Sequence, residues 1–414
     1  MRSSRQDLAL LTVAGLLLRL LFLPSPGHML DLQTFGQWAL AAADNPWNRA
    51  YEATDMNYPP GALLIFEAIG RTYRSLIKYD PDHFYLRLAV KLPNVLFDCI
   101  GIVVIYGIAR RFAEHSRALT AAALFAFNPA IIYDSSIWGM NDSITSVSAL
   151  AAVWCLLCGR RLSAWMLLGF AAFNKPPVVV LAPLFMLEAF ASVDRKEWKN
   201  RAIGVCAGIL AALCVGWILA YPFYTDHRFF AVYRRMFSWY VVGSSLYPFT
   251  SANAFNVHAL YGDFFRPDTT PFLFIPLKYW ADVAFIAVAG FIYLRYARLR
   301  DERGLLEACF LVLLAFFLFL TEMHERYLIY ALTFVPTLAA FDLAYFWATA
   351  GLTIAEWLNL EYSLTYMWLD FDKPQGVNPK EFAPVLVHLC ALTNIAVFIT
   401  GMRIYQSRHE STKA

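Results

Sequence analysis

Apolar runs of nearly membrane-spanning length recur along almost the whole of this 414-residue chain. Hydrophobic residues make up 59% of the sequence and charged residues only 16%, whereas soluble domains carry roughly 25% charged residues. In a bilayer every backbone polar group must be satisfied internally, and runs of about 20 apolar residues are typical of spanning helices. The sequence therefore predicts an all-α polytopic membrane protein, with residues 1–414 forming a single integral membrane domain.

We expect about twelve transmembrane helices. The N-terminal basic and apolar stretch resembles a signal peptide, but Arg19 interrupts the apolar run and no small-residue cleavage site follows it. We therefore interpret this stretch as a retained first helix. The predicted spans lie near residues 8–23, 88–109, 117–133, 143–158, 162–174, 177–191, 202–220, 273–297, 305–320, 327–341, 343–360 and 383–402.

The basic residues predict which ends of these helices face inward. With the N-terminus inside, short connections rich in arginine and lysine, such as ARRFAEHSR and DRKEWKNR, fall on the inner side, as the positive-inside rule requires. Two long outer loops follow, at about residues 24–87 and 221–272. Residues 59–77 are apolar enough to span, but a span there would move ARRFAEHSR outside, so we predict interfacial helices in this loop.

With this orientation, every unusual polar stretch falls on the outer side. A transporter would place its functional polar groups near the midplane of broken helices, whereas here they gather at one interface. This pattern predicts a site open to one side of the membrane. The stretches are DLQTFGQW from Asp31, DMNYPPG from Asp55, WGMNDS from Trp138, FNKPP from Phe173, YPFTSANAFNVH from Tyr247 and TEMHERY from Thr321.

Taken in this order, the motifs resemble the GT-C superfamily of membrane glycosyltransferases. The resemblance covers about residues 31–327 and is strongest to a bacterial mannosyltransferase-like branch related to the second mannosyltransferase of GPI-anchor assembly. It implies a GT-C fold and a polyprenyl-phosphate-linked sugar donor, with mannose as the expected sugar. It also implies a glycan, lipid or protein acceptor at the outer, periplasmic or lumenal face. Met140 and the Lys175-Pro176-Pro177 run depart from the family pattern, so the exact sugar and acceptor stay open.

Asp31 is the position that matches the catalytic carboxylate of the family's first outer loop. Sugar transfer with inversion needs a base that takes the acceptor hydroxyl's proton as C1 gains oxocarbenium character. The alternative is that Asp31 is the N-cap of the helix that begins at LQTFGQW. Asp55 and Tyr58 precede a Pro-Pro pair that would aim them inward as substrate contacts, although Asp55 could equally be a turn carboxylate.

Two further motifs predict contacts to the sugar and to the phosphate. Trp138 could stack on the sugar ring while Asn141 and Asp142 bind its hydroxyls, although Asn141 and Asp142 are also good helix caps. Lys175 could bind the carrier phosphate, which gains charge in the transition state, or its side chain could snorkel. The resemblance adds Asn253 and Asn256 of NAFN to the substrate-binding set.

The stretch TEMHERY is unusually polar for the end of an apolar run. Arg326 offers a planar fork for phosphate oxygens, His324 could donate a second bond, and Glu322 or Glu325 could hold the arginine. The alternative is a solvated turn with a local ion pair, which stabilises little. The HExxH zinc pattern does not apply, because HERYL lacks the second histidine.

We expect no metal ion, because the sequence shows no convincing set of metal ligands, and no cofactor. No glycine-rich phosphate loop is present, so a soluble nucleotide donor is not indicated. The expected partners are the lipid-linked sugar donor, the acceptor and membrane lipids, with no nucleic acid.

The alternative functions are a multi-spanning lipid or solute transporter or flippase without transferase activity, and a non-catalytic membrane subunit. Short loops and the lack of a C-terminal retrieval signal favour a bacterial inner membrane with a periplasmic site. The endoplasmic reticulum membrane is the alternative.

Overall fold

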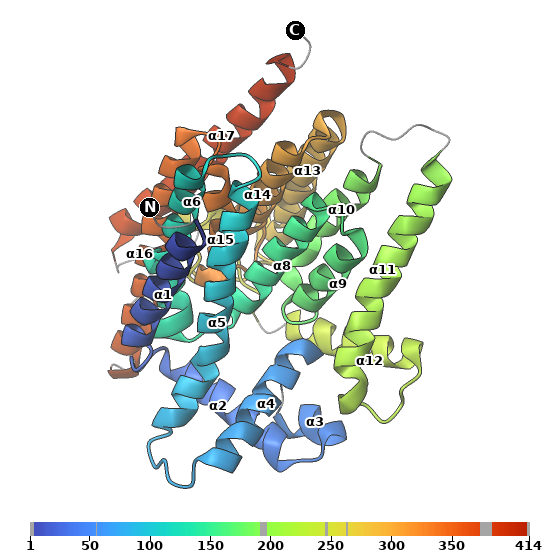
Figure 1. Cartoon of the computed structure of the whole chain (residues 1–414). Helices are drawn as coiled ribbons and strands as arrows, with labels where there is room; N and C mark the ends of the chain where they lie inside the picture. Colours follow the sequence, from blue (N-terminus) through green and yellow to red (C-terminus); the bar gives the residue numbers. More distant parts are fainter. Residues whose placement is uncertain are drawn as a thin grey trace. The chain divides into compact units, whose positions relative to one another are not determined.

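Figure 1 shows the computed structural model of the chain, which describes residues 4–54, 56–190, 197–244, 247–261, 264–372 and 383–411. The described chain is helical apart from one short β-hairpin, so the predicted helical class is confirmed. Contacts divide the chain into two compact units. The first comprises Met1–Val104, Ile131–Val179 and Ala202–Leu246, and the second comprises Ile105–Ala130, Val180–Arg201 and Tyr247–Ala414. The prediction of one domain over residues 1–414 stays a prediction.

The elements are named in chain order, and η marks a short 3-10 or π-helical turn. They are α1 (Ser4–Phe22), α2 (Met29–Asp44), η1 (Trp47–Arg49), α3 (Ala50–Thr54), α4 (Pro60–Leu76), α5 (Phe84–Ala109), α6 (His115–Ala126), α7 (Pro129–Ile132), η2 (Tyr133–Trp138), α8 (Asp142–Leu157), α9 (Arg161–Ala172), η3 (Pro176–Leu181), α10 (Ala182–Ala189), α11 (Trp198–Ala220), η5 (Tyr221–Phe223), α12 (Phe229–Ser244), η6 (Val257–Leu260), β1 (Pro271–Phe272), β2 (Ile275–Pro276), α13 (Leu277–Leu299), α14 (Glu302–Phe319), η7 (Glu325–Leu328), α15 (Ile329–Leu338), α16 (Leu343–Asp372) and α17 (Pro384–Ser411).

Helices occupy each of the twelve predicted spans, but the number of spans stays a prediction. Within the described residues, four helices are long and apolar enough to cross a membrane, namely α5, α11, α13 and α17. A fifth results if the bent pair His115–Ala126 and Pro129–Trp138 counts as one span. Some of the others are short, and α14 carries three charged residues, Glu302, Arg303 and Glu307. The apolar helices support an integral membrane protein.

The predicted first outer loop contains the helices α2, α3 and α4. Helices α2 and α4 lie side by side (Figure 1) and pack extensively against each other. Phe66 of α4 contacts Phe35 and Trp38 of α2, with ring centroids 5.1 and 5.9 Å apart. Helix α4, which covers the stretch predicted to be interfacial, is not among the helices long and apolar enough to span.

A buried ion pair joins α1 to α5 in the first unit. Arg19 Nε donates to Asp98 Oδ2 at 2.6 Å, and neither side chain is exposed. Ser135 of η2 donates a second hydrogen bond, of 2.7 Å, to the same oxygen. Removing one partner of such a pair leaves an uncompensated buried charge, so these contacts tie three segments of the first unit together.

Helices α14 and α15 form the core of the second unit. Almost every residue of α14 and all ten residues of α15 are buried, as expected for helices that are apolar on all sides. Helix α14 packs against α13, α15 and α17, and α15 also packs against α6 and α16. Asp301 caps α14 by accepting the Gly304 N–H at 2.6 Å.

Candidate functional site

Asp31 lies in the first turn of α2, and it does not cap the helix. The helix begins at Met29, and Nδ1 of His28 accepts the Asp31 backbone N–H at 3.2 Å. The interpretation of Asp31 as the N-cap is therefore wrong, because the helix starts three residues earlier than LQTFGQW suggests. A carboxylate in the first turn is favoured by the positive end of the helix dipole. Because His28 caps the helix, the Asp31 side chain can contact residues outside α2.

Trp138 holds the Asp31 carboxylate, and His28 lies beside it. Trp138 Nε1 donates a hydrogen bond of 2.8 Å to Asp31 Oδ2, and His28 Nδ1 lies 3.1 Å from the same oxygen. The imidazole of His28 stacks on the Trp138 indole, with centroids 4.7 Å apart and planes 4° from parallel. Trp138 is thus buried, and one face of its indole is covered by His28. In this structure its role is to position Asp31. The prediction that it stacks on a sugar stays a prediction.

The turn that presents Trp138 depends on a glycine. Residues 133–138 form a π-helical turn, a feature often found at functional sites. Gly139 ends the turn with φ +93°, and its N–H donates to Asp134 O at 2.9 Å. This backbone conformation is in the left-handed region, which side chains with a Cβ rarely adopt. Gly139 therefore turns the chain away directly after Trp138.

Asp142 and Lys175 form a buried ion pair. Lys175 Nζ lies 2.6 Å from Asp142 Oδ1, and the side chains are 5% and 0% exposed. Asp31 is different, because 27% of its side chain is exposed. Of the two carboxylates, only that of Asp31 is accessible enough to meet an acceptor hydroxyl in this conformation. The predicted contacts of Asp142 with a sugar and of Lys175 with a phosphate stay predictions, because in this structure the two residues bind each other.

A backbone hydrogen bond joins the YPPG and FNKPP motifs beside this ion pair. Gly61 N donates to Phe173 O at 2.8 Å, and Lys175 Nζ lies 5.4 Å from the centre of the Tyr58 ring. A Cβ on Gly61 would lie only 2.6 Å from Phe173 O, so the close approach requires glycine at this position. Asp55, the other residue predicted in this motif, lies outside the described residues.

Asn141 occupies the N-cap position of α8, but its side chain makes no capping hydrogen bond. It lines a small cavity, of about 10 Å³, together with Asn94 and apolar residues of α2, α4 and α5. The Oδ1 atoms of both asparagines are buried without a hydrogen-bond partner. Such amides usually bind an ordered water, so Asn141 is a polar group still able to accept a hydrogen bond.

Lys91 is a buried residue of this region that the sequence reasoning missed. Its Nζ donates to the carbonyl oxygens of Leu23 and Ser25, at 3.2 and 2.7 Å. These two residues lie in the turn that leads into α2. Lys91 therefore fixes the entry to the helix that carries Asp31. A lysine within an apolar span is itself a signal of such a role.

In the second unit, the MHERY segment is largely buried, so the interpretation as a solvated turn is wrong. Arg326 Nη1 donates to Glu325 Oε1 at 2.6 Å, and the two side chains are 11% and 5% exposed. The arginine also lies over the Tyr327 ring. The predicted pairing of the arginine with a neighbouring glutamate is confirmed for Glu325. The burial follows from the position of η7, which lies against α14, α15 and α16.

The NAFN motif packs against the same segment. Ala252 N donates to Met323 O at 2.9 Å, and Asn253 and His324 pair through their backbones. The His324 ring contacts the Tyr247 and Tyr327 rings edge-on, at 4.7 and 5.4 Å. These contacts bring together His324, Arg326 and Asn253, which are separated by some 70 residues in the sequence.

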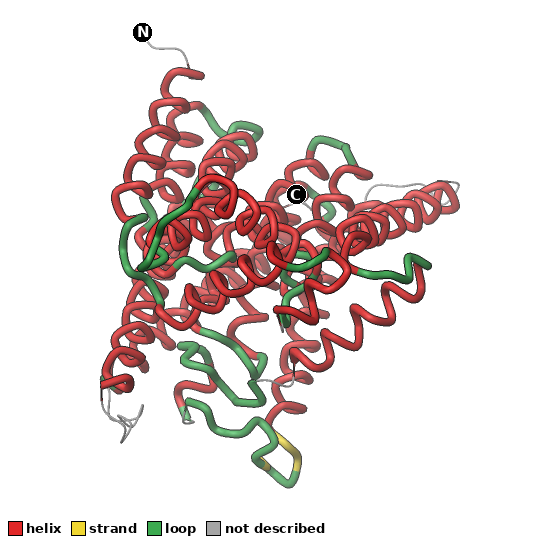
Figure 2. Tube along the Cα trace, turned by 90° about the horizontal axis from the view of Figure 1, so that it is seen from below, coloured by secondary structure: helices red, strands yellow, loops and turns green. Residues whose placement is uncertain are grey.

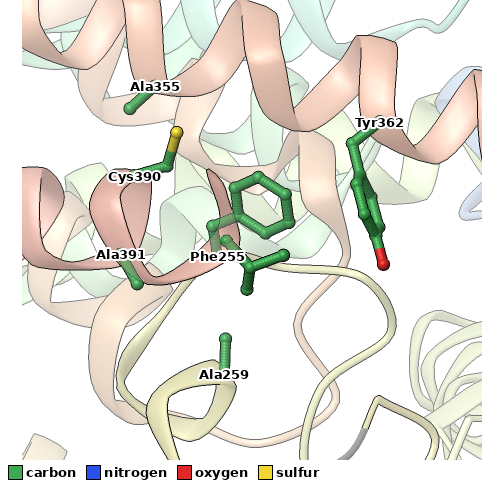
Figure 3. Close-up of a cluster of buried hydrophobic side chains, with 7 residues drawn as sticks. Phe255, Ala259, Ala355, Tyr362, Cys390 and Ala391 are labelled. Atoms are coloured by element: carbon green, nitrogen blue, oxygen red, sulfur yellow. The ribbon is translucent and has the colours of Figure 1, made fainter. Parts of the chain in front are cut away.

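The side chains of NAFN divide into fixed and available groups. Phe255 enters a buried cluster with Tyr362 of α16 and Cys390 of α17 (Figure 3). Asn256 donates to Phe317 O at 3.2 Å and accepts from His258 N at 3.0 Å, so its side chain serves the fold. Asn253 has φ +63°, and its Oδ1 is buried without a hydrogen-bond partner. Asn253 is therefore the better candidate for a substrate contact.

Glu322 is a titratable group at the edge of this segment. Burial raises its pKa to about 7, and the negative charge of Asp268 adds to the shift. Asp268 is 1% exposed, and a side-chain hydrogen bond between the two residues also raises the pKa of Glu322. A protonated Glu322 can donate to Asp268, as in pairs of carboxyl groups that share one proton. Among the described residues, no three His, Cys, Asp or Glu side chains are grouped so as to hold a metal ion.

The structure thus gathers the predicted residues into two groups, one in each compact unit. The first group comprises Asp31, Tyr58, Trp138, Asn141, Asp142 and Lys175, to which the structure adds His28 and Lys91. The second comprises Asn253, Asn256, His324, Glu325 and Arg326, to which the structure adds Asp268.

Comparison with protein families gives one match. Residues 85–220, about a third of the chain, match the family described as dolichyl-phosphate-mannose-protein mannosyltransferase. This match supports the predicted relationship to the GT-C superfamily of membrane glycosyltransferases. The matched region contains Trp138, Asp142 and Lys175 but neither Asp31 nor the MHERY segment. The finer relationship to the second GPI mannosyltransferase stays a prediction.

Two solved structures of an Archaeoglobus fulgidus oligosaccharyltransferase are among those similar to this chain. The apo form is 11% identical, with a TM-score of 0.49, and the match covers 94% of this chain and 56% of that one. The form tethered to an acceptor peptide with the NVT sequon is 12% identical, with a TM-score of 0.44, over 96% and 55% of the two chains. This chain therefore spans little more than half the length of the archaeal enzyme. No curated protein sequence matches the chain.

Proposed function

We propose that the chain is an inverting, metal-independent glycosyltransferase that moves mannose from a polyprenyl-phosphate carrier to an acceptor at the outer face of the membrane. The observation that carries this proposal is the partly exposed Asp31 carboxylate, which accepts a hydrogen bond from Trp138 and lies beside His28. The family description matched by residues 85–220 names a dolichyl-phosphate-mannose donor, which supports the choice of donor and sugar. We place the protein in a bacterial inner membrane with its site on the periplasmic side.

Asp31 acts as the general base in this proposal. One of its carboxylate oxygens takes the proton of the acceptor hydroxyl while the oxygen of that hydroxyl bonds to C1 of the sugar. The bond from C1 to the phosphate oxygen breaks on the opposite face, so the configuration at C1 inverts and polyprenyl phosphate leaves. The hydrogen bond from Trp138 fixes the direction of the carboxylate, and its partial exposure lets the proton pass to water afterwards.

The remaining predicted residues would bind the donor and the acceptor. Arg326, held by Glu325, has the planar fork that matches phosphate oxygens, and His324 offers a second donor. Lys175 is a further candidate for phosphate binding, with Asp142 holding its ammonium group. Asn141 and Asn253, each with a buried free Oδ1, are the proposed contacts to sugar or acceptor hydroxyls.

The test is sugar transfer by the full-length protein in nanodiscs. Radiolabelled polyprenyl-phosphate-mannose and a membrane-lipid acceptor pool are supplied to the wild type, to Asp31→Asn and to the control Asp44→Asn. Asp44 lies at the other end of α2, where it pairs with the exposed Arg74. We expect Asp31→Asn to lose about 10²- to 10⁴-fold in rate, as for a general base, and Asp44→Asn to match the wild type.

Two outcomes would overturn the proposal. One is a folded Asp31→Asn protein that transfers sugar at the wild-type rate, which would remove the base from this position. The other is a wild type that transfers no sugar from a panel of lipid-linked donors but moves a lipid-linked sugar across a vesicle membrane. The second result would establish the alternative function, a transporter or flippase.

A further inference from the structure

A β-hairpin with an apolar tip precedes α13 in the second unit. In it, Pro271 pairs with Pro276 and Phe272 with Ile275, and Figure 2 shows the strands at the end of a loop. Leu273 and Phe274 therefore form a two-residue turn, and both have positive φ, +49° and +68°. The segment from Pro271 to Leu277 carries no charged residue.

This turn has residues that its backbone disfavours. Two-residue hairpin turns with positive φ at both positions strongly prefer Asn-Gly, because larger side chains clash with the backbone there. Leu273 and Phe274 bear that steric cost, yet they gain no burial within the protein, since they are 65% and 99% exposed. A strained conformation that persists without an internal gain points to a function outside the fold.

The hairpin is fastened to the first turn of α13. Trp280 Nε1 donates to Phe272 O at 2.9 Å, and the two rings meet edge-on at 6.4 Å. Helix α13 is long and apolar enough to cross a membrane, and in the topology expected from the sequence its first turn lies at a boundary of the hydrocarbon region. The exposed Tyr279 and Trp280 are residues typical of that boundary.

We propose that this hairpin is a membrane anchor, whose tip residues Leu273 and Phe274 insert into the lipid leaflet in which α13 begins. A lipid surface fits the hairpin better than a protein partner does, because the apolar tip is continuous with a spanning helix. Lipid also stabilises exposed apolar side chains without requiring a complementary shape. Leu277 N donates to Thr270 O and Lys278 N to Asp268 O. The anchor would therefore hold the loop that carries Asp268 at the membrane surface.

The test is photocrosslinking of the full-length protein in lipid nanodiscs. The photoreactive amino acid p-benzoylphenylalanine replaces Phe274, and lipid adducts are measured by mass spectrometry. Ile286, which is exposed on α13, is the positive control, and Tyr79, which is exposed between Lys78 and Asp80, is the negative control. We expect roughly tenfold or more lipid adduct at 274 than at 79, since burial of a large apolar side chain favours the inserted state by about that factor.

The result that would overturn the proposal is adduct formation at 286 without lipid adduct at 274. A second variant separates the chemistry of the tip from the fold of the hairpin. The pair Leu273→Asn and Phe274→Gly supplies the residues that this turn prefers, so thermal stability in detergent should not fall. With the crosslinker at Phe272, lipid adducts should then drop about tenfold. Unchanged adducts would show that the apolar tip does not insert.

Discussion

The indole N–H of Trp138 donates a hydrogen bond of 2.8 Å to Oδ2 of Asp31, across 107 residues of sequence. The same indole is stacked on His28, whose Nδ1 accepts the Asp31 backbone N–H. The orientation of the proposed base is thus set by two aromatic side chains. This arrangement makes Trp138 and His28 positioning residues for Asp31.

Replacing Trp138 by Phe removes the hydrogen bond to Asp31 and keeps most of the apolar contact. We expect kcat/KM for sugar transfer to fall about tenfold to a hundredfold, because a hydrogen bond to a charged group contributes roughly 1.5–3 kcal/mol. Steady-state transfer assays measure this loss. Trp347→Phe, at an exposed position on α16, is the matched control and should leave the rate unchanged. Equal rates for the two variants would show that Trp138 does not position the base.

The Asp142–Lys175 pair allows stability and activity to be separated. Asp142→Ala or Lys175→Ala leaves an uncompensated buried charge, which costs about 3–5 kcal/mol, so each single variant should melt at a clearly lower temperature. The double variant Asp142→Leu with Lys175→Met removes both charges and should recover most of the stability. If Lys175 binds the carrier phosphate, this recovered protein still fails to transfer sugar. Full activity of the stable double variant would show that the pair serves the fold alone.

Glu322 makes stability depend on pH. Its pKa is raised from the ordinary value of 4.5 to about 7, first by burial and then by Asp268, while Lys278 opposes the shift and Asp282 adds to it. The folded protein therefore keeps a proton that the unfolded chain releases, and its stability falls as the pH rises from about 4.5 to about 7. Below this window the contribution of Glu322 is fully present, and above it the contribution is lost.

Thermal unfolding in detergent between pH 5 and 8 tests the role of Glu322. In Glu322→Gln the melting temperature should depend less on pH over this range, whereas the exposed control Glu114→Gln should show the same pH dependence as the wild type. A slope that survives in Glu322→Gln would assign the pH dependence to another group.

Gly61 and Gly204 provide a matched pair of glycine substitutions. A Cβ at Gly61 would lie 2.6 Å from Phe173 O, whereas one at Gly204 of α11 would meet no atom within 4 Å. Gly61→Ala should destabilise the protein by about 1–3 kcal/mol, because the backbone must move to relieve the overlap. Gly204→Ala should be neutral or stabilise by up to about 1 kcal/mol, since alanine favours a helix. The melting temperatures of the two variants are compared. Equal melting temperatures would show that the YPPG and FNKPP backbones lie farther apart than the structure indicates.

The sequence was a good guide to the helices because apolar runs are a local signal. Each predicted span coincides with a helix, and the long first outer loop contains helices at the predicted place. The boundaries were less predictable. Proline marked the start of α4, but the start of α2 depended on His28, which is not among the side chains that most favour a cap.

The sequence also pointed to most members of the candidate site, because polar residues are conspicuous beside apolar runs. It predicted that a glutamate would hold Arg326, and the two residues are adjacent in the chain. It did not predict the burial of the MHERY segment, since burial depends on the helices packed around it. Lys91 and Asp268 were missed, because their surroundings come from distant segments.

The sequence by itself determined that this is a helical membrane protein and where its polar motifs lie, since hydrophobicity and charge act on each segment locally. Only the tertiary structure decided the partners of those motifs. Asp142 meets Lys175 across 33 residues, and Asp31 meets Trp138 across 107. Such pairs form because buried charges and N–H groups must find partners in a medium of low dielectric constant, and packing decides which partners are within reach.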